Sequence, residues 1–266
     1  MGKSIVVTSG KGGVGKTTIV GNIGTGLALK GKRVVLIDVD IGLRNLDLVL
    51  GLENRIVYTI MDVLDGSCKL SQALVKDKRF KNRLYLLPAA QTRMKEEIKI
   101  EDLRDIVLKL KKEFDFVILD SPAGIEHGFR LSTLSSDEAI VVTTPEITAI
   151  RDADRVIGLL ESMEIFDPKL IINRVKFDMV KKGEMLDWKD ISDILSVEVI
   201  GLVPEDEYVT ISTNMGEPAI LNQKSPGGRE MMNIVRRMLG EDVPIVEEKS
   251  KEGFLDKLSH LFKKER

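Results

Sequence analysis

The sequence predicts an α/β protein whose doubly wound, mostly parallel sheet is covered by helices on both faces. Short runs of aliphatic and β-branched residues alternate along the chain with segments of helical periodicity. The runs are continuously apolar, which is typical of strands that are buried on both faces of a parallel sheet. Such sheets bind ligands at the carboxyl ends of their strands, so the loops after the apolar runs are candidates for a functional site.

The predicted strands and helices interleave from the start of the chain to residue 240. The predicted strands are residues 4–9, 33–38, 84–87, 116–120, 139–143, 170–172 and 197–203. The predicted helices are residues 16–30, 57–64, 100–113, 147–162, 187–195, 205–215 and 227–239. We therefore expect one domain over residues 1–240, a polar linker over residues 241–251 and a separate helix over residues 252–266.

The loop between the first predicted strand and the first predicted helix is rich in glycine. It reads Gly10-Lys11-Gly12-Gly13-Val14-Gly15-Lys16-Thr17-Thr18 and matches G-x-x-x-x-G-K-[ST], the phosphate-binding P-loop. Glycines let the backbone curl so that successive N–H groups make an anion nest, and the following helix presents its positive end to the same phosphates. We expect Lys16 to reach the terminal phosphates and the Thr17 hydroxyl to ligate Mg²⁺.

Carboxylates follow two of the apolar runs. Asp120 ends one run, and an aspartate at this place in P-loop ATPases, the Walker B position, holds Mg²⁺ directly or through water. Asp38 ends another run, and Asp40 lies on the same side of the chain because strand residues two apart share a face. We expect all three carboxylates to meet the P-loop at one edge of the sheet.

Composition limits the other functions that the chain can have. Forty basic and forty-two acidic residues give a net charge of −2, which does not indicate a nucleic-acid binder. Cys68 is the single cysteine, so one chain has neither an internal disulfide nor a cysteine metal site, and this fits a reducing cytosol. No signal-peptide pattern is present, and no apolar run approaches the roughly 18 residues of a membrane span. We expect a chain that is soluble or peripheral to a membrane.

The end of the chain has an amphipathic pattern. Its apolar residues have helical spacing and are Phe254, Leu255, Leu258, Leu261 and Phe262. From residue 249 onward six basic residues oppose three acidic ones, so this end carries a charge of +3. The pattern predicts an interfacial helix that binds an anionic membrane surface. One such helix should bind weakly, whereas two on one dimer should bind far better.

Lys11 distinguishes the glycine-rich loop from the general P-loop pattern. It is a second lysine directly after the first glycine, although Lys16 already serves the phosphates. The chain resembles the ParA/MinD family of deviant Walker A ATPases. The resemblance rests on this loop, the segment from Asp38 to Asp47, the strand that ends at Asp120 and the amphipathic end. In that family the extra lysine reaches across a dimer to the nucleotide of the other subunit. The resemblance implies a homodimer that forms with ATP and in which Lys11 is a catalytic contact.

The same resemblance implies roles for the other site residues. Asp38 would belong to the outer shell of Mg²⁺, Asp40 would orient the hydrolytic water, and Asn45 would contact the partner subunit. The residues that it implies near the base are Asn173, Arg174, Pro204 and Glu205. No glutamate base is evident beside Asp120, so we expect a slow Mg²⁺-dependent ATPase that is activated by dimerisation and by a partner.

Within the family the chain is similar to the branch that determines the septum site. Members of that branch cycle between the cytosol and an ATP-bound dimer on the cytoplasmic face of the cell membrane. They recruit the division inhibitor MinC and are stimulated by the activator MinE. The resemblance thus implies an ATPase that controls where the division ring forms. The segment around Arg151, Asp152 and Asp154 is a candidate partner surface.

Other functions stay open on the sequence alone. A flagellar-number ATPase would share the loop and the amphipathic end but usually carries an N-terminal extension. A ParA-like partition ATPase would bind DNA, and its support is the basic cluster Lys76, Lys78, Arg79, Lys81 and Arg83. An iron–sulfur carrier of the nitrogenase reductase type needs two cysteines per chain and fails on Cys68. A scaffold that binds ATP without hydrolysing it also stays open.

Overall fold

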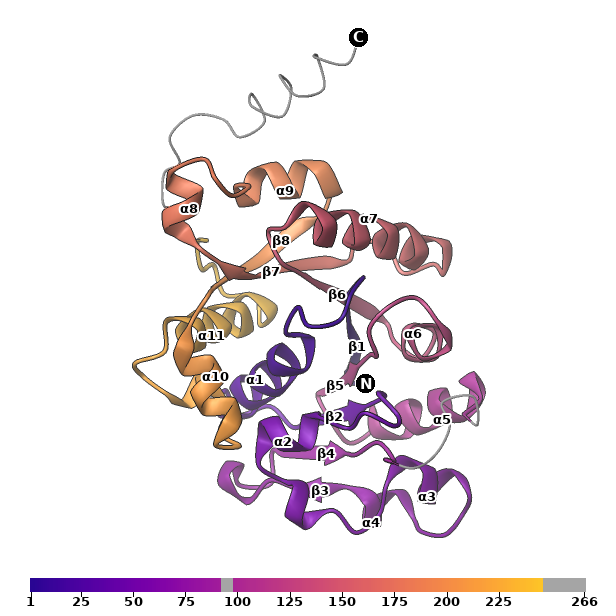
Figure 1. Cartoon of the computed structure of the whole chain (residues 1–266). Helices are drawn as coiled ribbons and strands as arrows, with labels where there is room; N and C mark the ends of the chain where they lie inside the picture. Colours follow the sequence, from indigo (N-terminus) through magenta and orange to yellow (C-terminus); the bar gives the residue numbers. More distant parts are fainter. Residues whose placement is uncertain (92–97, 246–266) are drawn as a thin grey trace.

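One mixed sheet forms the centre of the computed structural model, which describes residues 1–91 and 98–245 (Figure 1). The sheet has eight strands in the order β3-β4-β2-β5-β1-β6-β7-β8. All neighbours are parallel except β3, which runs antiparallel to β4 at one edge. The strands are β1 (Lys3–Thr8), β2 (Val34–Asp38), β3 (Val75–Lys76), β4 (Leu84–Leu87), β5 (Phe116–Asp120), β6 (Glu138–Thr143), β7 (Lys169–Val175) and β8 (Glu198–Pro204). The predicted fold class is confirmed.

Helices cover both faces of the sheet (Figure 1). One face packs against α1 and α11, and the other packs against α5, α6, α7 and α9. The helices are α1 (Lys16–Leu29), α2 (Leu46–Leu50), α3 (Ile60–Leu64), α4 (Leu70–Ala73), α5 (Ile100–Leu110), α6 (His127–Thr133), α7 (Ile147–Ser162), α8 (Phe177–Lys181), α9 (Trp188–Leu195), α10 (Glu207–Asn214) and α11 (Pro226–Met238). Short 3₁₀ helices are η1 (Glu53–Arg55), η2 (Lys78–Phe80) and η4 (Ala219–Leu221).

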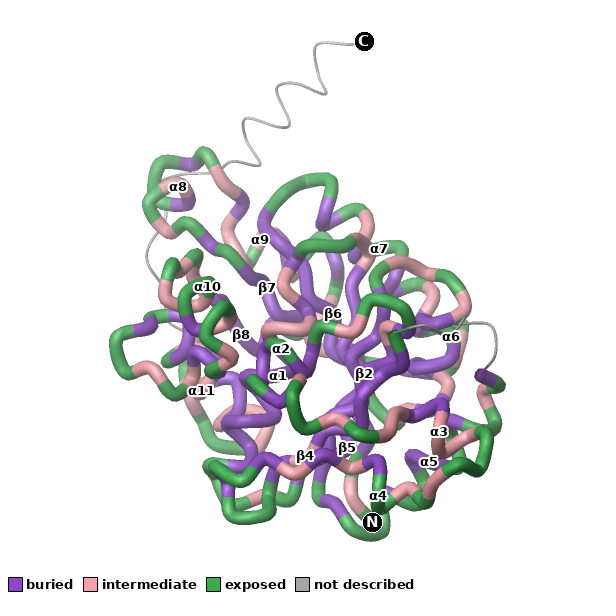
Figure 2. The backbone as a smooth tube through the Cα atoms, turned by 60° about the horizontal axis from the view of Figure 1, so that its bottom comes forward, coloured by how far each residue is buried: buried purple, intermediate pink, exposed green. Residues whose placement is uncertain are grey.

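Apolar side chains fill two cores, one on each side of the sheet. Within β1, Val6 faces one core while Ile5 and Val7 face the other, as strand alternation requires. Because both faces are covered, the central strands are buried along most of their length, and exposed backbone gathers in the loops and on the outer helices (Figure 2). This explains why the strands are continuously apolar in the sequence.

The structure contains short elements that the sequence pattern does not reveal. The predicted helix at 57–64 is shorter, since α3 begins at Ile60, and α2, α4 and α8 have only four or five residues each. Segments of that length complete too few turns to show helical periodicity. The helix α6 begins with His127-Gly128 and contains Ser132, which are weak helix formers. These elements form because the surrounding domain packs against them.

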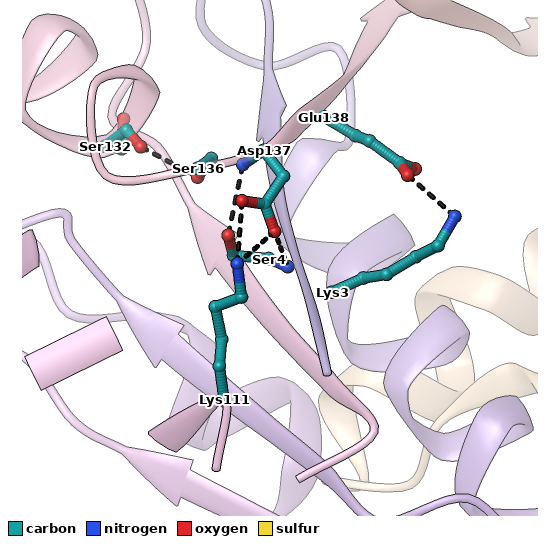
Figure 3. A network of polar contacts seen from close by, with 7 residues as sticks. All are labelled: Lys3, Ser4, Lys111, Ser132, Ser136, Asp137 and Glu138. Atoms are coloured by element: carbon teal, nitrogen blue, oxygen red, sulfur yellow. Dashed lines mark hydrogen bonds and ion pairs between the residues drawn. The ribbon is translucent and has the colours of Figure 1, made fainter. Parts of the chain in front are cut away.

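Figure 3 shows a network of polar contacts at the amino ends of β1 and β6. The P-loop follows the carboxyl end of β1 and so lies on the opposite side of the sheet. Asp137, just before β6, accepts hydrogen bonds from the backbone N–H of Ser4 at 2.9 Å and from Lys111 Nζ at 2.5 and 2.7 Å. Beside it Lys3 donates to Glu138 at 2.7 Å. Burial raises the pKa of Asp137, but the bonds from Lys111 and Ser4 outweigh it and leave this pKa below its usual value. The network joins β1, β6 and the end of α5.

The predicted linker and amphipathic helix fall largely outside the described part of the chain. Residues 246–266 are not described, so the helix at 252–266 and its five apolar residues stay a prediction. Before that point, Arg237 in α11 donates to the carbonyl oxygens of Val243 at 2.8 Å and Pro244 at 2.9 Å. Among the helices described, none has the length and apolarity needed to cross a membrane.

Candidate nucleotide-binding site

The glycine-rich loop lies at the carboxyl edge of the sheet, between β1 and α1. Gly13 and Gly15 have φ angles of 80° and 94°, a region that favours glycine. A Cβ at Gly15 would lie 2.3 Å from Nδ2 of Asn173, and a Cβ at Gly10 would lie 2.4 Å from the backbone of Asp152 in α7. The loop is therefore held closely between β7 and α7, and larger residues would not fit at these two contacts.

Lys16 and the start of α1 supply positive charge to this loop. Lys16 is the first residue of α1 and is only 8% exposed. Gly15 precedes the helix and has no side chain that could cap it, so the first N–H groups of α1 stay available to a ligand. A lysine at a helix N-terminus behind a glycine nest is an arrangement that binds phosphates.

Two buried carboxylates lie side by side next to the loop. Asp38 and Asp120 are paired across the neighbouring strands β2 and β5, and each is 1% exposed. Asp38 accepts hydrogen bonds from the N–H groups of Asp40 at 2.9 Å and of Asn45 and Leu46 at 3.3 Å. An interaction with the Thr17 hydroxyl acts to lower the pKa of the Asp120 carboxylate. The expected meeting of Asp38, Asp120 and the P-loop is thus present.

Burial and mutual repulsion disfavour the ionised form of both carboxyl groups. Burial, and then the charge of Asp120, raises the pKa of Asp38 to about 8. Burial raises the pKa of Asp120 to about 6, although Lys16 and Thr17 act in the opposite direction. A divalent cation beside the pair would offset both effects, because its charge favours the ionised carboxylates.

The donor atoms fit Mg²⁺ held jointly with a nucleotide. Oδ1 of Asp120 is buried and has no hydrogen-bond partner, so an oxygen ligand is available there. Among the described residues no cluster of three or more acidic, histidine or cysteine side chains forms a self-sufficient metal site. Mg²⁺ in phosphate sites typically uses one or two carboxylates, substrate phosphates and waters, and P-loops add a Ser or Thr hydroxyl. Thr17, Asp38 and Asp120 match that pattern.

Lys11 points to α7. Its Nζ lies 3.0 Å from Oε2 of Glu146 and 3.5 Å from the hydroxyl of Thr148, and its side chain is 36% exposed. It therefore lies at the rim of the site, where a second molecule could be reached. Asn45 is also exposed and precedes α2, while its backbone N–H is bound to Asp38.

A cavity of about 360 Å³ adjoins the loop on the side of β7 and β8. All four residues expected near the base line it: Asn173, Arg174, Pro204 and Glu205. Asn173 also has a role that the sequence did not predict, because its Nδ2 donates to the carbonyl oxygen of Val14 at 2.7 Å and so supports the P-loop. The sequence analysis missed the wall formed by α10, namely Val209, Thr210, Thr213 and Asn214.

The basic cluster that supported DNA binding contains one cation that is neutralised within the chain. The side chain of Arg79 is 36% exposed, and its guanidinium is paired with the fully buried carboxylate of Asp77. Arg79 therefore does not contribute a free cation to a surface patch, although Lys78, Lys81 and Arg83 stay exposed. This weakens the argument for a basic surface over residues 76–83.

Comparison with known proteins bears on the same site. A family profile described as "AAA domain" matches residues 2–171. The chain is 52% identical over 264 residues to the septum site-determining protein MinD of Bacillus subtilis, and the match covers 98% of both chains. It is also 52% identical to the septum site-determining protein MinD of Thermotoga maritima, over 99% of this chain and 98% of the relative. The chain belongs to the MinD family.

Solved MinD structures share the fold described above. The MinD cell division protein of Aquifex aeolicus is 49% identical, covers 92% of this chain and superposes with a TM-score of 0.85 over its full length. MinD of Pyrococcus horikoshii, solved in complex with Mg-ADP, is 30% identical over 90% of this chain and 96% of its own, with a TM-score of 0.81. As a member of the MinD family, the chain is a P-loop ATPase of the ParA/MinD type.

Proposed function

We propose that the chain is a Mg²⁺-dependent ATPase that dimerises with ATP, attaches to an anionic membrane surface and positions the cell-division site by recruiting a division inhibitor. The division role rests on the 52% identity with a septum site-determining protein over 98% of both chains. A solved complex of MinC and MinD from Aquifex aeolicus, 51% identical over 92% of this chain, supports MinC as that inhibitor. MinE is proposed as the activator from the resemblance alone.

The P-loop and the carboxylates of Asp38, Asp40 and Asp120 would have different roles in ATP hydrolysis. The P-loop N–H groups and Lys16 would hold the phosphates, and the Thr17 hydroxyl would be a ligand of the metal. Bound Mg²⁺ would neutralise charge on the phosphates. Asp120 and Asp38 would hold the metal directly or through water, and Asp40 would position the attacking water. The Mg-ADP complex of the Pyrococcus horikoshii relative supports Mg²⁺ and an adenine nucleotide as the molecules bound at this site.

Asp40→Asn tests whether the chain turns ATP over. We expect the rate of phosphate release to fall about 100-fold, the usual contribution of a group that positions or deprotonates a nucleophile. ATP affinity should change less than about threefold, because Asp40 is not expected to bind the phosphates. Asp167→Asn, at an exposed acid near the opposite edge of the sheet, is the matched control. Unchanged phosphate release in Asp40→Asn would contradict the proposed role.

Attachment to the membrane would depend on the dimer. A dimer carries two copies of the amphipathic segment at residues 252–266, and the second copy binds at high effective concentration once the first is bound. Nucleotide-driven dimerisation would then move the chain from the cytoplasm to the cytoplasmic face of the membrane. Hydrolysis would reverse the change.

Co-sedimentation with anionic phosphatidylglycerol vesicles tests this switch. The full chain with ATP should bind more than about tenfold better than the chain with ADP, as expected for two linked weak anchors. A chain that ends at Lys249 should lose this binding. Within the full chain, Leu258→Asp should bind poorly, because it places a charge on the apolar side. His260→Asp adds the same charge on the opposite side and should retain most of the binding.

Two outcomes would overturn the membrane role. One is equal vesicle binding by the full chain and by the chain that ends at Lys249. The other is equal loss of binding in Leu258→Asp and His260→Asp, since that would indicate a response to net charge alone.

A further inference from the structure

Two helices border opposite ends of the nucleotide site, and their C-terminal ends meet. Helix α2 begins at Leu46, whose N–H donates to the carboxylate of Asp38 on the metal side at 3.3 Å. Helix α10 forms the wall of the base cavity with Val209, Thr210 and Thr213. The two helices pack against each other. They run from the two ends of the site to a common junction.

The junction itself is a backbone-to-backbone contact between two glycines. Gly51 follows α2 and Gly216 follows α10, and both have positive φ angles, 64° and 65°. A Cβ at Gly51 would lie 2.5 Å from the carbonyl oxygen of Gly216, and a Cβ at Gly216 would lie 2.7 Å from Cα of Gly51. No side chain separates the two helix ends, so a shift of one must be accommodated by the other.

Arg79 binds both helix ends at this junction. Its Nη2 donates to the carbonyl oxygen of Leu50, the last residue of α2, and its Nη1 donates to the carbonyl oxygen of Gly216 at 3.4 Å. The last carbonyl groups of a helix, such as that of Leu50, lack partners within the helix and carry partial negative charge. The carbonyl group of Gly216 lies in the turn that follows α10, which ends at Asn214. A guanidinium can bind both oxygens at once, because its N–H groups form a rigid planar fork.

The orientation of that fork is fixed by Asp77. Its carboxylate is fully buried and accepts hydrogen bonds from Nε of Arg79 at 3.0 Å and from Nη2 at 2.7 Å. The backbone N–H of Arg79 donates to the same carboxylate at 3.0 Å. Asp77 thus holds one side of the guanidinium, and the remaining N–H groups are directed to the helix ends. A lysine could keep the ion pair but could not reproduce this geometry.

We infer that Arg79 is a positioning residue that ties the metal-side helix α2 to the base-side helix α10, so that binding at one end of the nucleotide site supports binding at the other. The inference rests on the proposed ATPase function. Arg79 acts through Leu50 and Gly216 and touches no nucleotide itself. Its consequence is measurable as coupling: the gain in ATP affinity caused by Mg²⁺ depends on Arg79.

The test compares ATP affinity with Mg²⁺ and with excess EDTA in the full chain. In the native chain Mg²⁺ should increase ATP affinity. In Arg79→Lys we expect Mg-ATP binding to weaken about fivefold to tenfold and the Mg²⁺-dependent gain to fall by a similar factor. The KM of Mg-ATP should rise more than kcat falls, because positioning of the base and the metal is affected rather than the attacking water. Lys78→Gln, an exposed neighbour in the same turn, should behave like the native chain.

A second variant separates positioning from folding. Asp77→Asn combined with Arg79→Gln removes both charges and leaves no buried carboxylate without a cation. It should fold and should also show a reduced Mg²⁺-dependent gain. A lower melting temperature with an unchanged gain in both variants would mean that Arg79 is only structural, and the inference would be wrong. Absence of any Mg²⁺-dependent ATP binding in the native chain would instead overturn the proposed function, and the inference with it.

Discussion

Lys16→Gln is expected to weaken ATP binding by about 10²- to 10⁴-fold. The substitution removes two charge-assisted contacts to phosphate oxygens, which contribute about 1.5–3 kcal/mol each. Lys16 is only 8% exposed at the start of α1, so no exposed side chain can easily replace it. The metal side is affected too, because burial raises the pKa of Asp120 and the Lys16 charge opposes that rise. Titration calorimetry with Mg-ATP measures the loss.

A matched control keeps the result specific. Lys32→Gln removes a half-buried lysine just beyond the other end of α1, away from the site, and should leave ATP affinity unchanged. Far-ultraviolet circular dichroism should show that both variants keep the native helix content. An ATP affinity in Lys16→Gln within about tenfold of the native value would contradict a phosphate-binding role, since one charged contact alone contributes more than that.

The motif-bearing parts of the site follow from local sequence. The P-loop can be predicted because its chemistry requires glycines and a lysine at fixed spacing, and Asp38 and Asp120 can be predicted because each ends an apolar run. Parallel strands bring their carboxyl ends to one edge, so proximity of the acids to the loop is also expected. The local sequence does not predict that Asp38 and Asp120 are paired across β2 and β5, because this pairing depends on the strand order of the whole sheet.

The unpredicted parts of the site depend on contacts between residues far apart in the chain. Asn173 supports Val14 from 159 positions away, and Arg79 reaches Gly216 from 137 positions away. Neither residue type nor spacing encodes such a partner. In the sequence Arg79 belongs to a basic run and suggests a solvated face. In the structure its guanidinium is paired with the buried carboxylate of Asp77. The glycines that let α2 and α10 meet likewise have no local signature.

Lys11→Gln should keep the ATP binding that Lys16→Gln loses, although the two lysines lie in one loop. Lys11 is bound to Glu146 at the rim of the site and is 36% exposed, so its own subunit should bind ATP without it, within about threefold of the native affinity. Dimer formation with ATP should be lost, because the partner's phosphates lose a contact. The turnover rate under conditions that activate the native dimer should fall about 10³-fold, the lower range for a cation supplied in trans. Sedimentation velocity and phosphate release measure the two losses.

Mixing the two variants distinguishes a role in trans from a role in cis. Lys11→Gln alone and Lys16→Gln alone should both be inactive. In a mixed dimer the Lys11→Gln subunit still binds ATP through its own Lys16, and the Lys16→Gln subunit presents an intact Lys11 to that nucleotide. One complete site is thereby formed, so mixing should restore part of the phosphate release. An inactive mixture, together with ATP-dependent dimers of Lys11→Gln alone, would place Lys11 in its own subunit's site. Activity that returns only on mixing requires a site built from two chains.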